Sequence, residues 1–379
     1  MPSRIMIVAG EASGDLHGAN LVRALKEQAL DLTFCGMGGS ALAGQDVEIL
    51  YDSAKMAVVG LSEVLAHLQD IRAAMKTLVK RLRQQRPDLL ILIDYPDFNL
   101  ILAGKAKKLG IPVFYYISPQ IWAWRRSRVR KIRKRVDRMA VILPFEEEFY
   151  GRYDMAVDFV GHPLLDSVRS SKSRDEFLAQ YGIDREATVI GLLPGSRRNE
   201  IATLLPIFLE AARLVAEEIP KPVFLLPLAP GLSETELARH GLAESPLDVR
   251  IISENRYELM AACRVAMIAS GTATLELAIL GVPMVVCYRI SPLTYFLGRR
   301  LIKVPFVSLV NLVAGRQVVP ELLQDEATPE TISKELRRML CEPARLAGIR
   351  QDLSEVRERL GKAGASGRAA RAALELIRP

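Results

Sequence analysis

Two carboxylates that could take up a proton follow an apolar run in the first half of the chain. The run Asp88–Ile93 (D-L-L-I-L-I) lacks polar alternation and therefore predicts a strand that is buried on both faces. Asp94 would stand at the carboxyl end of this strand, the edge where parallel sheets bind ligands, and Asp97 follows three residues later. A partly buried carboxylate beside a second one has a raised pKa, which suits a general base. Both side chains could instead cap a turn or a helix, an alternative that weighs more on Asp97 than on Asp94.

A second pair of carboxylates lies in the glycine turn Gly10–Asp15 (G-E-A-S-G-D), directly after a predicted strand at Arg4–Ala9. Negative charge in this turn would repel a phosphate group. Glu11 and Asp15 are therefore candidates for binding sugar hydroxyl groups, or for acting as the base in place of Asp94.

Phosphate binding is expected instead at a turn in the second half of the chain, within Leu192–Glu200 (L-L-P-G-S-R-R-N-E). Gly195 and Ser196 fall between a predicted strand and a predicted helix, where glycine allows close backbone approach and the unpaired N–H groups attract phosphate. Arg197 could add a forked cationic contact. An ordinary strand-to-helix turn with an exposed arginine explains the segment equally well, and the sequence does not match a Walker loop.

A similar turn occurs within Ile268–Ala278 (I-A-S-G-T-A-T-L-E-L-A), again after an apolar run. The small polar run Ser270–Thr272 predicts the turn, and Thr272 or Thr274 could cap the helix that follows. Glu276 lies four residues after Thr272, so the two side chains share one helix face. A carboxylate there could accept hydrogen bonds from ribose hydroxyls, or it could only interact with the helix dipole. Two such helix starts at the carboxyl edge of one sheet would form a nucleotide diphosphate site.

Neither a metal nor an organic cofactor is expected. No D-x-D triplet follows a predicted strand, no C-x-x-C pair is present, and only four histidines are available. Cys35, Cys263 and Cys287 lie in apolar runs and are expected to be buried, reduced thiols, which fits a reducing cytoplasm.

The bulk composition is that of a folded protein with a basic surplus. The chain has 379 residues, half of them apolar and a quarter charged, and a net charge of +7. This length predicts two domains, and the charge favours a polyanionic partner, which could be nucleic acid, an anionic membrane face or a phosphorylated substrate. No apolar window approaches the roughly 20 residues that span a bilayer, and no signal segment is recognised, so a soluble or peripheral protein is expected.

Short apolar strands alternate with helical segments, which predicts an α/β fold of doubly wound parallel sheets. Helices are expected at His17–Ala29 and Glu200–Glu217. Strands of the first half are expected at Arg4–Ala9, Asp31–Gly36, Asp88–Ile93, Ile111–Ile117 and Met139–Leu143. After a polar linker within Asp166–Glu186, strands are expected at Ala187–Leu193, Pro222–Leu226, Val249–Ile252, Val265–Ala269 and Met284–Cys287. We therefore predict domains at residues 1–168 and 169–345, and a helical tail at 346–379.

The segment Arg125–Arg138 holds nine basic residues and one acidic residue. Val129, Ile132 and Val136 are spaced three and four apart, which predicts a helix with one apolar stripe. So one-sided a cluster favours an anionic lipid surface or a phosphorylated substrate over a simple solvated face. Nucleic acid is not expected as a partner, because neither an interleaved aromatic platform nor a zinc motif accompanies the charge.

Seven short motifs in order give the chain a more specific resemblance. They are G-E-A-S-G-D (Gly10–Asp15), D-Y-P-D-F-N (Asp94–Asn99), S-P-Q-I-W-A-W-R (Ser118–Arg125), G-H-P (Gly161–Pro163), L-P-G-S-R (Leu193–Arg197), A-S-G-T-A-T-L-E (Ala269–Glu276) and V-S-L-V-N (Val307–Asn311). Together they resemble the signatures of the lipid-A-disaccharide synthase family. Each motif alone is weak, but seven in order are specific.

The resemblance implies a GT-B type fold, with two facing Rossmann-like domains and the nucleotide on the second. It implies an inverting, metal-independent transfer that joins UDP-2,3-diacylglucosamine to 2,3-diacylglucosamine 1-phosphate and releases UDP. The first domain would take the acceptor and face the membrane. The residues that it implies for catalysis are Asp94, Asp97 and Glu11. Those that it implies for substrate binding are Ser13, Gly14, Asp15, Arg125, Gly195, Ser196, Arg197, Glu200, Ser270, Gly271, Thr272, Glu276 and Asn311.

Because the substrates of that family carry acyl chains, the apolar stripe along Leu61–Leu82 has two interpretations. It could pack in the core, or it could bind acyl chains or dip into a membrane. Trp122 and Trp124 could likewise lie at a membrane interface or in the core. The resemblance implies a cytoplasmic protein, peripheral on the anionic inner face of the inner membrane. The oligomeric state stays open, with a homodimer among the options.

Two other function classes remain open at this point. One is another GT-B enzyme, such as a UDP-N-acetylglucosamine transferase or 2-epimerase, which would share the second half but not G-E-A-S-G-D or S-P-Q-I-W-A-W. The other is a non-catalytic basic protein that binds a membrane or nucleic acid, which would not bind UDP.

Overall fold

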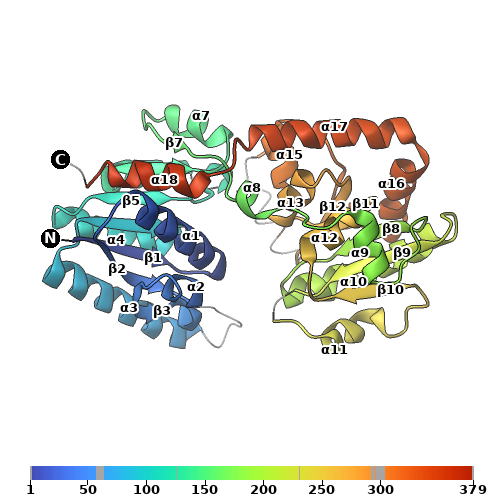
Figure 1. Cartoon of the computed structure of the whole chain (residues 1–379), viewed down its shortest axis with the longest axis horizontal. Helices are drawn as coiled ribbons and strands as arrows, with labels where there is room; N and C mark the ends of the chain where they lie inside the picture. Colours follow the sequence, from blue (N-terminus) through green and yellow to red (C-terminus); the bar gives the residue numbers. More distant parts are fainter. Residues whose placement is uncertain are drawn as a thin grey trace. The chain divides into compact units, whose positions relative to one another are not determined.

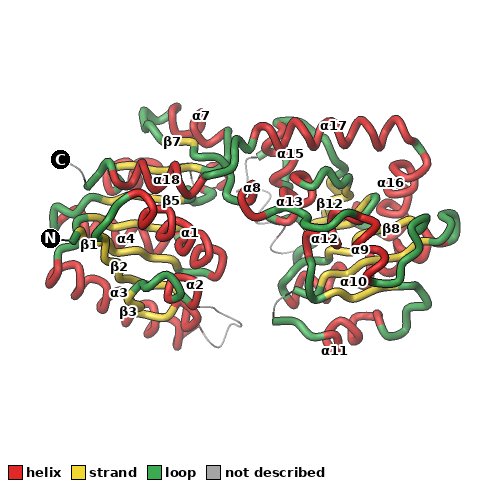
Figure 2. Tube along the Cα trace, in the orientation of Figure 1, coloured by secondary structure: helices red, strands yellow, loops and turns green. Residues whose placement is uncertain are grey.

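The computed structural model divides the chain into two units, each built on its own parallel sheet (Figure 1). It describes residues 2–56, 64–124, 126–229, 231–291, 295 and 304–377, with residues 55, 56 and 64–67 described by their backbone alone. Unit 1 comprises Met1–Pro163 together with Gly361–Pro379, and unit 2 comprises Leu164–Leu360. Figure 2 shows strands in yellow, with helices in red packed around them in each unit.

Unit 1 has a seven-stranded sheet among the described residues, in the order β3-β2-β1-β4-β5-β6-β7, and every pair is parallel. Its strands are β1 (Ser3–Ala9), β2 (Leu32–Gly38), β3 (Glu48–Asp52), β4 (Leu89–Ile93), β5 (Val113–Tyr116), β6 (Arg138–Val141) and β7 (Asp158–Phe159). The apolar run that predicted a two-faced buried strand is β4, all five residues of which are buried. The expected doubly wound parallel sheet is confirmed.

The helices of unit 1 follow the strands in alternation. They are α1 (Ala12–Gln28), α2 (Ser40–Ala43), α3 (Val64–Gln85), α4 (Pro96–Lys108), α5 (Ile121–Trp124), α6 (Val129–Arg135), α7 (Phe145–Gly151) and α18 (Ala365–Leu374), with short 3-10 turns at Ser53–Met56 and Arg126–Arg128. The helix expected at His17–Ala29 begins earlier, at Ala12, because the glycine turn itself opens into the first helical turn.

The last helix, α18, belongs to unit 1 rather than to a separate tail. Its alanines and Leu374 lie in the same buried cluster as Ile5, Leu21 and Phe34, and Figure 1 shows α18 beside α1. The predicted tail at 346–379 therefore differs from the structure, in which α17 ends unit 2 and the chain returns to unit 1 at Gly361. Small side chains on α18 allow this close packing against α1.

Unit 2 has a six-stranded sheet among the described residues, in the order β10-β9-β8-β11-β12-β13, again with every pair parallel. Its strands are β8 (Thr188–Leu193), β9 (Pro222–Pro227), β10 (Val249–Ile252), β11 (Val265–Ala269), β12 (Met284–Tyr288) and β13 (Glu321–Leu323). All five strands expected in this half are confirmed. The short strand β13 was not expected.

The helices of unit 2 are α8 (Leu164–Ser167), α9 (Arg174–Gln180), α10 (Arg198–Ala216), α11 (Glu234–Leu237), α12 (Arg256–Ala262), α13 (Ala273–Ile279), α15 (Leu309–Ala314), α16 (Pro329–Cys341) and α17 (Pro343–Arg359), with a π-helical turn at Ala238–Leu242 and a 3-10 turn at Gln324–Glu326.

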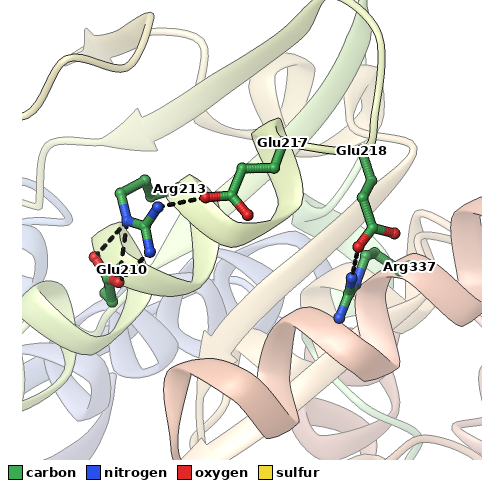
Figure 3. A network of polar contacts seen from close by, with 5 residues as sticks. All are labelled: Glu210, Arg213, Glu217, Glu218 and Arg337. Carbon is green, nitrogen blue, oxygen red and sulfur yellow. Dashed lines mark hydrogen bonds and ion pairs between the residues drawn. The ribbon is translucent and has the colours of Figure 1, made fainter.

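Figure 3 shows ion pairs on α10 and α16. Arg213 bridges Glu210 (2.8 Å) and Glu217 (2.5 Å) on α10, and Arg337 of α16 contacts Glu218. Of these pairs, the one between Arg337 and Glu218, just past the end of α10, connects two helices that pack together.

The polar segment expected as a linker, Asp166–Glu186, lies wholly within unit 2. The units divide at Pro163 and Leu164, slightly before the predicted boundary at residue 168. Ser173 caps α9, accepting a hydrogen bond from the N–H of Glu176, whose carboxylate accepts one from the N–H of Ser173 in return. The serine and glutamate that made this segment look like a linker thus form a helix capping box.

Both sheets have a topological switch point, where the strand order reverses. In unit 1 it lies between β1 and β4, and in unit 2 between β8 and β11. Open α/β sheets bind ligands beyond the carboxyl ends of the strands at such points. The turns at Gly10–Asp15 and Asp94–Asp97 follow the first strand pair, and those at Gly195–Arg197 and Ser270–Thr272 follow the second.

Candidate active site

Asp94 sits directly after β4 in an unusual backbone conformation. Its φ is 44° and that of Tyr95 is 45°, so both residues adopt the left-handed backbone conformation that glycine usually takes. Pro96 then begins α4. Such conformations cost about 1–3 kcal/mol each and are kept where surrounding contacts enforce them. The enforcing contacts come from Asn99, whose amide donates to the main-chain oxygens of Ile93 (3.1 Å) and Asp94 (2.7 Å). The hydroxyl of the buried Tyr115 also donates to the oxygen of Asp94.

The environment of the Asp94 carboxyl group favours its protonated form. Burial raises its pKa to about 6, and the negative charge of Glu11 adds to the increase. The N–H of Tyr95 donates to the carboxylate and opposes part of the shift. A carboxylate with a pKa near neutrality can accept a proton and release it again, as a general base must.

Glu11 occupies the N-cap position of α1, but its side chain makes no capping hydrogen bond and is exposed. Gly10, the residue before Glu11, explains why the turn Gly10–Asp15 lies against the turn that follows β4. A Cβ atom at Gly10 would lie 2.5 Å from the ring of Tyr95, so only glycine fits there. The contact between Gly10 and Tyr95 thus brings the two candidate bases, Glu11 and Asp94, into electrostatic range of each other.

Asp97 differs from the other two acidic candidates in its exposure. Its side chain is 77% exposed and forms an ion pair with Arg128, on the 3-10 turn before α6. The exposed position keeps the carboxylate hydrated, which does not favour a base. The partner could not be predicted from the sequence, because Arg128 is one of several arginines in the basic segment.

Asp15 has a structural place that the sequence interpretation did not foresee. Its carboxylate accepts hydrogen bonds from the backbone N–H groups of Gly39 (2.7 Å), Ala41 (2.9 Å) and Leu42 (3.2 Å), at the start of α2. Only 6% of the residue is exposed. Three donors within the protein thus satisfy the carboxylate, and the expected contact of Asp15 with a sugar stays a prediction.

The two smaller residues of the same turn lie in different environments. Ser13 is exposed on the first turn of α1. Gly14 is buried, and a Cβ atom there would be in ordinary contact with Ala9 and Ile93, at the ends of β1 and β4. Of the two, Ser13 is placed where a substrate could reach its side chain.

A groove of about 1070 Å³ opens beside these residues within unit 1. Glu11, Tyr95 and Asp97 line it together with side chains of α3 and α4. The apolar stripe predicted over Leu61–Leu82 is divided between two faces of α3. Its residues Ala74, Leu78 and Leu82 are fully buried, whereas Ile71, Met75 and Val79 are half-buried and line the groove. Residues 57–63 of the same predicted region lie outside the described residues.

More side chains of the basic segment Arg125–Arg138 contact the rest of the protein than its charge suggested. Val129, Ile132 and Val136 are all buried, but α6 covers only Val129–Arg135, so the expected single helix with this stripe is shorter than predicted and Val136 follows its end. Arg133 and Arg135 donate to main-chain oxygens, those of Tyr153 and Leu100 respectively. Side chains that stay exposed without such a contact in the described structure are Arg130, Lys131 and Lys134. Arg125, expected at the substrate, lies outside the described residues.

The two tryptophans before this segment differ in exposure. Trp122 is buried, and its indole N–H donates to Glu146 (3.3 Å), which is only 1% exposed. The N–H groups of Ile142 and Leu143 also donate to Glu146, whose pKa burial raises to about 7. Trp124 is 48% exposed. One tryptophan therefore packs in the core, and the other meets solvent.

In unit 2, the glycine turn after β8 has the expected conformation, but its N–H groups bind a side chain of the protein itself. Gly195 has a φ of 113°, which only glycine adopts readily. The N–H groups of Ser196 and Arg197 both donate to the carboxylate of Glu200, at 3.1 and 3.2 Å. The Arg197 guanidinium is exposed and pairs with the same carboxylate. The donors expected to bind phosphate thus bind Glu200 in this structure.

The turn after β11 leads into α13 and positions Glu276. This carboxylate is 6% exposed, and Arg256 of α12 forms an ion pair with it. Burial raises the pKa of Glu276, and the positive charge of Arg256 opposes the increase. Arg256 was not expected at this site, because it stands 20 residues away and nothing in its own segment marks it.

The three turn residues before Glu276 keep exposed or half-exposed positions. The hydroxyl of Ser270 donates to the main-chain oxygen of Val307 (3.3 Å), while Gly271 and Thr272 are exposed. Of the two threonines that could cap α13, Thr272 stands at the N-cap position, but its hydroxyl makes no capping hydrogen bond. Thr274 is fully buried, and its hydroxyl donates to the oxygen of Gly271 (2.8 Å).

Asn311, expected to contact a substrate, is buried and satisfied within unit 2. Its amide nitrogen donates to Val319 and Glu321, and its amide oxygen accepts from the N–H groups of Val318 and Val319, all within 3.1 Å. It is 0% exposed. The side chain therefore has a structural role in joining α15 to the segment before β13.

Among the described residues, with gaps at 57–63, 125, 230, 292–294 and 296–303, there is neither a metal-binding cluster nor a membrane-spanning helix. No group of three or more histidine, cysteine, aspartate or glutamate side chains is arranged to hold a metal ion in this part of the chain. Within the same residues, none of the helices combines the length and apolarity that crossing a bilayer requires. The four cysteines are free thiols, with Cys263 and Cys287 buried, Cys35 half-buried and Cys341 exposed.

Comparison with known proteins connects this geometry to a family. The family model described as lipid-A-disaccharide synthetase matches residues 5–376. The chain is 51% identical to the lipid-A-disaccharide synthase of Geobacter metallireducens over 374 residues, which cover 99% of this chain and 97% of that protein. It is 47% identical to that of Myxococcus xanthus over 380 residues, covering 100% and 98%. A glycosyltransferase of kitacinnamycin shares the fold, with a TM-score of 0.67 and 16% identity, covering 100% of both chains. The fold is thus that of GT-B glycosyltransferases, and the chain belongs to the lipid-A-disaccharide synthase family.

Proposed function

We propose that Asp94 is the general base of the disaccharide-forming reaction of this family, and that unit 1 holds the acceptor. The reaction joins UDP-2,3-diacylglucosamine to 2,3-diacylglucosamine 1-phosphate. The observation that carries the proposal is the pKa of Asp94, about 6, at the switch point of the unit 1 sheet. Above this pH the carboxylate is ready to take the proton from the acceptor 6-hydroxyl as that oxygen attacks the donor sugar and UDP leaves from the opposite face.

Glu11, whose exposed side chain a substrate can reach, is the second candidate for the same role. Its side chain makes no capping bond and lines the groove that Tyr95 and Asp97 also line. In our proposal Glu11 contacts acceptor hydroxyls and holds the pKa of Asp94 high. Asp97, which is exposed and paired with Arg128, orients α6 and the acceptor rather than taking the proton.

The base assignment is tested by three matched variants that each remove one charge. Asp94→Asn should lower kcat by about 10²–10⁴-fold, the usual effect of losing a general base. Asp97→Asn and Glu11→Gln should lower it less. UDP binding, measured by calorimetry, should be unchanged in Asp94→Asn because the nucleotide is assigned to unit 2. Near-normal turnover in Asp94→Asn together with a large loss in Glu11→Gln would move the base to the first turn.

For the donor, we infer that UDP binds unit 2 at the switch point between β8 and β11. The support is the position of two strand-to-helix turns there, Gly195–Arg197 and Ser270–Thr272, with the buried Glu276 one turn into α13. Glu276 is assigned to the ribose hydroxyls, and its ion pair with Arg256 would keep it ionised. Glu276→Ala should weaken UDP binding in calorimetry, while the exposed control Glu234→Ala should not. Unchanged affinity in Glu276→Ala would remove this residue from the site.

The family's acylated substrates also lead us to propose peripheral attachment to the anionic cytoplasmic face of the inner membrane. Residues near Met56–Leu68 and the segment Arg125–Arg138 are the surfaces assigned to it. Leu68 is 41% exposed, and Arg130, Lys131 and Lys134 are exposed on α6. Apolar insertion and charge attraction would act together, as peripheral proteins generally need two such signals.

A further inference from the structure

The groove between α3 and α4 bears on how one substrate of the transfer reaction is recognised. We propose that it binds an acyl chain of the phosphorylated sugar acceptor and so selects acceptors by chain length. The proposal rests on the acceptor role given to unit 1 above. It is carried by three properties of the groove, which are its apolar floor, its basic rim and the carboxylates at one end.

The floor is built from apolar side chains of two helices. Three of them stand four residues apart on α3 and two lie on α4, and they are Ile71, Met75, Val79, Phe98 and Ile101. The opposite stripe of α3, which includes Leu78 and Leu82, is packed in the core, whereas this second stripe stays half-buried. Ile101 is 53% exposed, and no described element covers it. Apolar side chains that line a groove in this way offer a hydrocarbon chain a surface to pack against.

The rim carries only positive charge along α3 and the end of α4. Its exposed cations are Arg72, Lys76, Lys80, Arg83 and Lys105. Within the described part of the chain, none of the five forms an ion pair with a carboxylate. An apolar floor flanked by unneutralised cations complements an amphiphile with a hydrocarbon chain and an anionic headgroup. A phosphorylated, acylated sugar has both parts.

The acidic end of the groove connects this surface to the candidate base. Glu11, Tyr95 and Asp97 line the same groove, and the charge of Glu11 reaches Asp94. Carboxylates at one end would repel an anionic bilayer, but they suit the hydroxyl groups of a sugar ring. We therefore assign the groove to the acceptor rather than to a phospholipid of the membrane. Its volume, about 1070 Å³, is slightly above the range of ordinary ligand pockets, about 300–1,000 Å³, which leaves room for a long chain.

The test uses the complete protein and acceptors whose acyl chains are short enough to stay monomeric in water. One chain is lengthened two carbons at a time. With wild-type protein, the acceptor KM should fall about fifteenfold per step until the groove is filled, at about 0.8 kcal/mol for each buried CH₂. Ile101→Asp places a charge on the floor and should flatten this dependence and raise KM for the longer acceptors. The matched control is Leu30→Asp, since Leu30 is 91% exposed and lies outside the groove.

A second variant tests the basic rim at two exposed positions, where a substitution should not disturb folding. Lys76→Gln/Lys80→Gln should raise KM for the acceptor 1-phosphate about tenfold or more at low salt, with the effect shrinking as salt is added. Both positions are exposed, so circular dichroism and thermal unfolding should match wild type.

Each outcome separates this proposal from the one it rests on. If wild-type protein forms no disaccharide, the proposed function fails, whatever the groove does. If wild type is active and Ile101→Asp keeps the same chain-length dependence, the groove does not bind the acceptor chain. Loss of binding to anionic vesicles in Ile101→Asp, with acceptor KM unchanged, would assign the groove to the membrane and overturn the proposal.

Discussion

The side-chain amide of Asn99 donates a hydrogen bond of 2.7 Å to the main-chain oxygen of Asp94. This bond, with the one that the same nitrogen donates to Ile93, holds Asp94 in the left-handed conformation with a φ of 44°. Asn99 lies one turn into α4 and is fully buried. The position of the candidate base is therefore set by a residue that itself has no chemistry to perform.

Replacing Asn99 should consequently affect both stability and rate. Asn99→Ala leaves two buried carbonyl groups with fewer donors, which should lower the free energy of unfolding by about 1–3 kcal/mol. It should also lower kcat, because Asp94 loses the support of its strained backbone. Urea unfolding and steady-state kinetics measure the two effects. The control Gln351→Ala, at an exposed site on α17 of unit 2, should change neither, and a stability loss with unchanged kcat would show that Asn99 does not position the base.

The pH dependence of the reaction should report the pKa of Asp94. Because this pKa is raised to about 6, the base is protonated and inactive below that pH, and kcat/KM should rise through about pH 6 to a plateau. The charge of Glu11 contributes to the shift, so Glu11→Gln should move the midpoint to lower pH. A midpoint that stays in place in Glu11→Gln would mean that the two carboxylates do not interact.

Glu146 should make unit 1 less stable as pH rises. Its pKa is raised from 4.5 to about 7 in the folded protein, so the folded state binds its proton more tightly than the unfolded state. The free energy of unfolding therefore loses this contribution as pH increases from about 4.5 to about 7, by up to about 3 kcal/mol at about 1.4 kcal/mol per pKa unit. Glu146→Gln cannot ionise, so its stability relative to wild type should improve between pH 5 and pH 8 in urea unfolding. A constant difference would show that Glu146 does not titrate in this range.

The carboxylate of Glu200 should compete with the nucleotide. It accepts the N–H groups of Ser196 and Arg197, the donors assigned to a phosphate of UDP. Glu200→Gln removes the negative charge and should tighten UDP binding about fivefold, as about 1 kcal/mol of charge repulsion at 4 Å in water would give. Calorimetry at low salt measures this, with Glu210→Gln, on the same helix, as the control. Weaker binding would instead mean that Glu200 contacts the nucleotide directly.

Attachment to anionic vesicles should have two components that salt separates. Charge attraction through Arg130, Lys131 and Lys134 should fall as salt increases, whereas apolar insertion near Leu68 should not. Flotation with vesicles that contain anionic lipid measures both, and neutral vesicles are the control. Absence of flotation with anionic vesicles at every salt concentration would exclude peripheral attachment.

The sequence predicted the central strands well because their signal is local. The run Asp88–Ile93 is apolar throughout after its first residue, and β4 begins one residue later, at Leu89. The strands that were missed, β3, β7 and β13, lie at or next to the sheet edges and are short, between two and five residues. Too few residues are present in them for an apolar pattern to develop.

The candidate site was predictable in its turns but not in its partners. The positions of Asp94 and Glu276 follow from the strands before them. The roles of Asp15 and Asn311 do not, because their hydrogen-bond partners belong to backbone segments whose proximity only the folded chain creates. For the same reason Arg256, the partner of Glu276, carries no sequence signal.

The return of the chain to unit 1 at Gly361 has a consequence for the order in which the protein is made. A ribosome completes all of unit 2, about 200 residues, before it reaches α18, which at about 5–20 residues per second takes about 10–40 s. During this interval the surface around Leu21 and Leu25 of α1, which α18 later covers, is already made but lacks its partner helix. Unit 1 is thus the unit that is translated first but completes its core last. Until α18 is made, the uncovered apolar surface of α1 is open to contact with other chains.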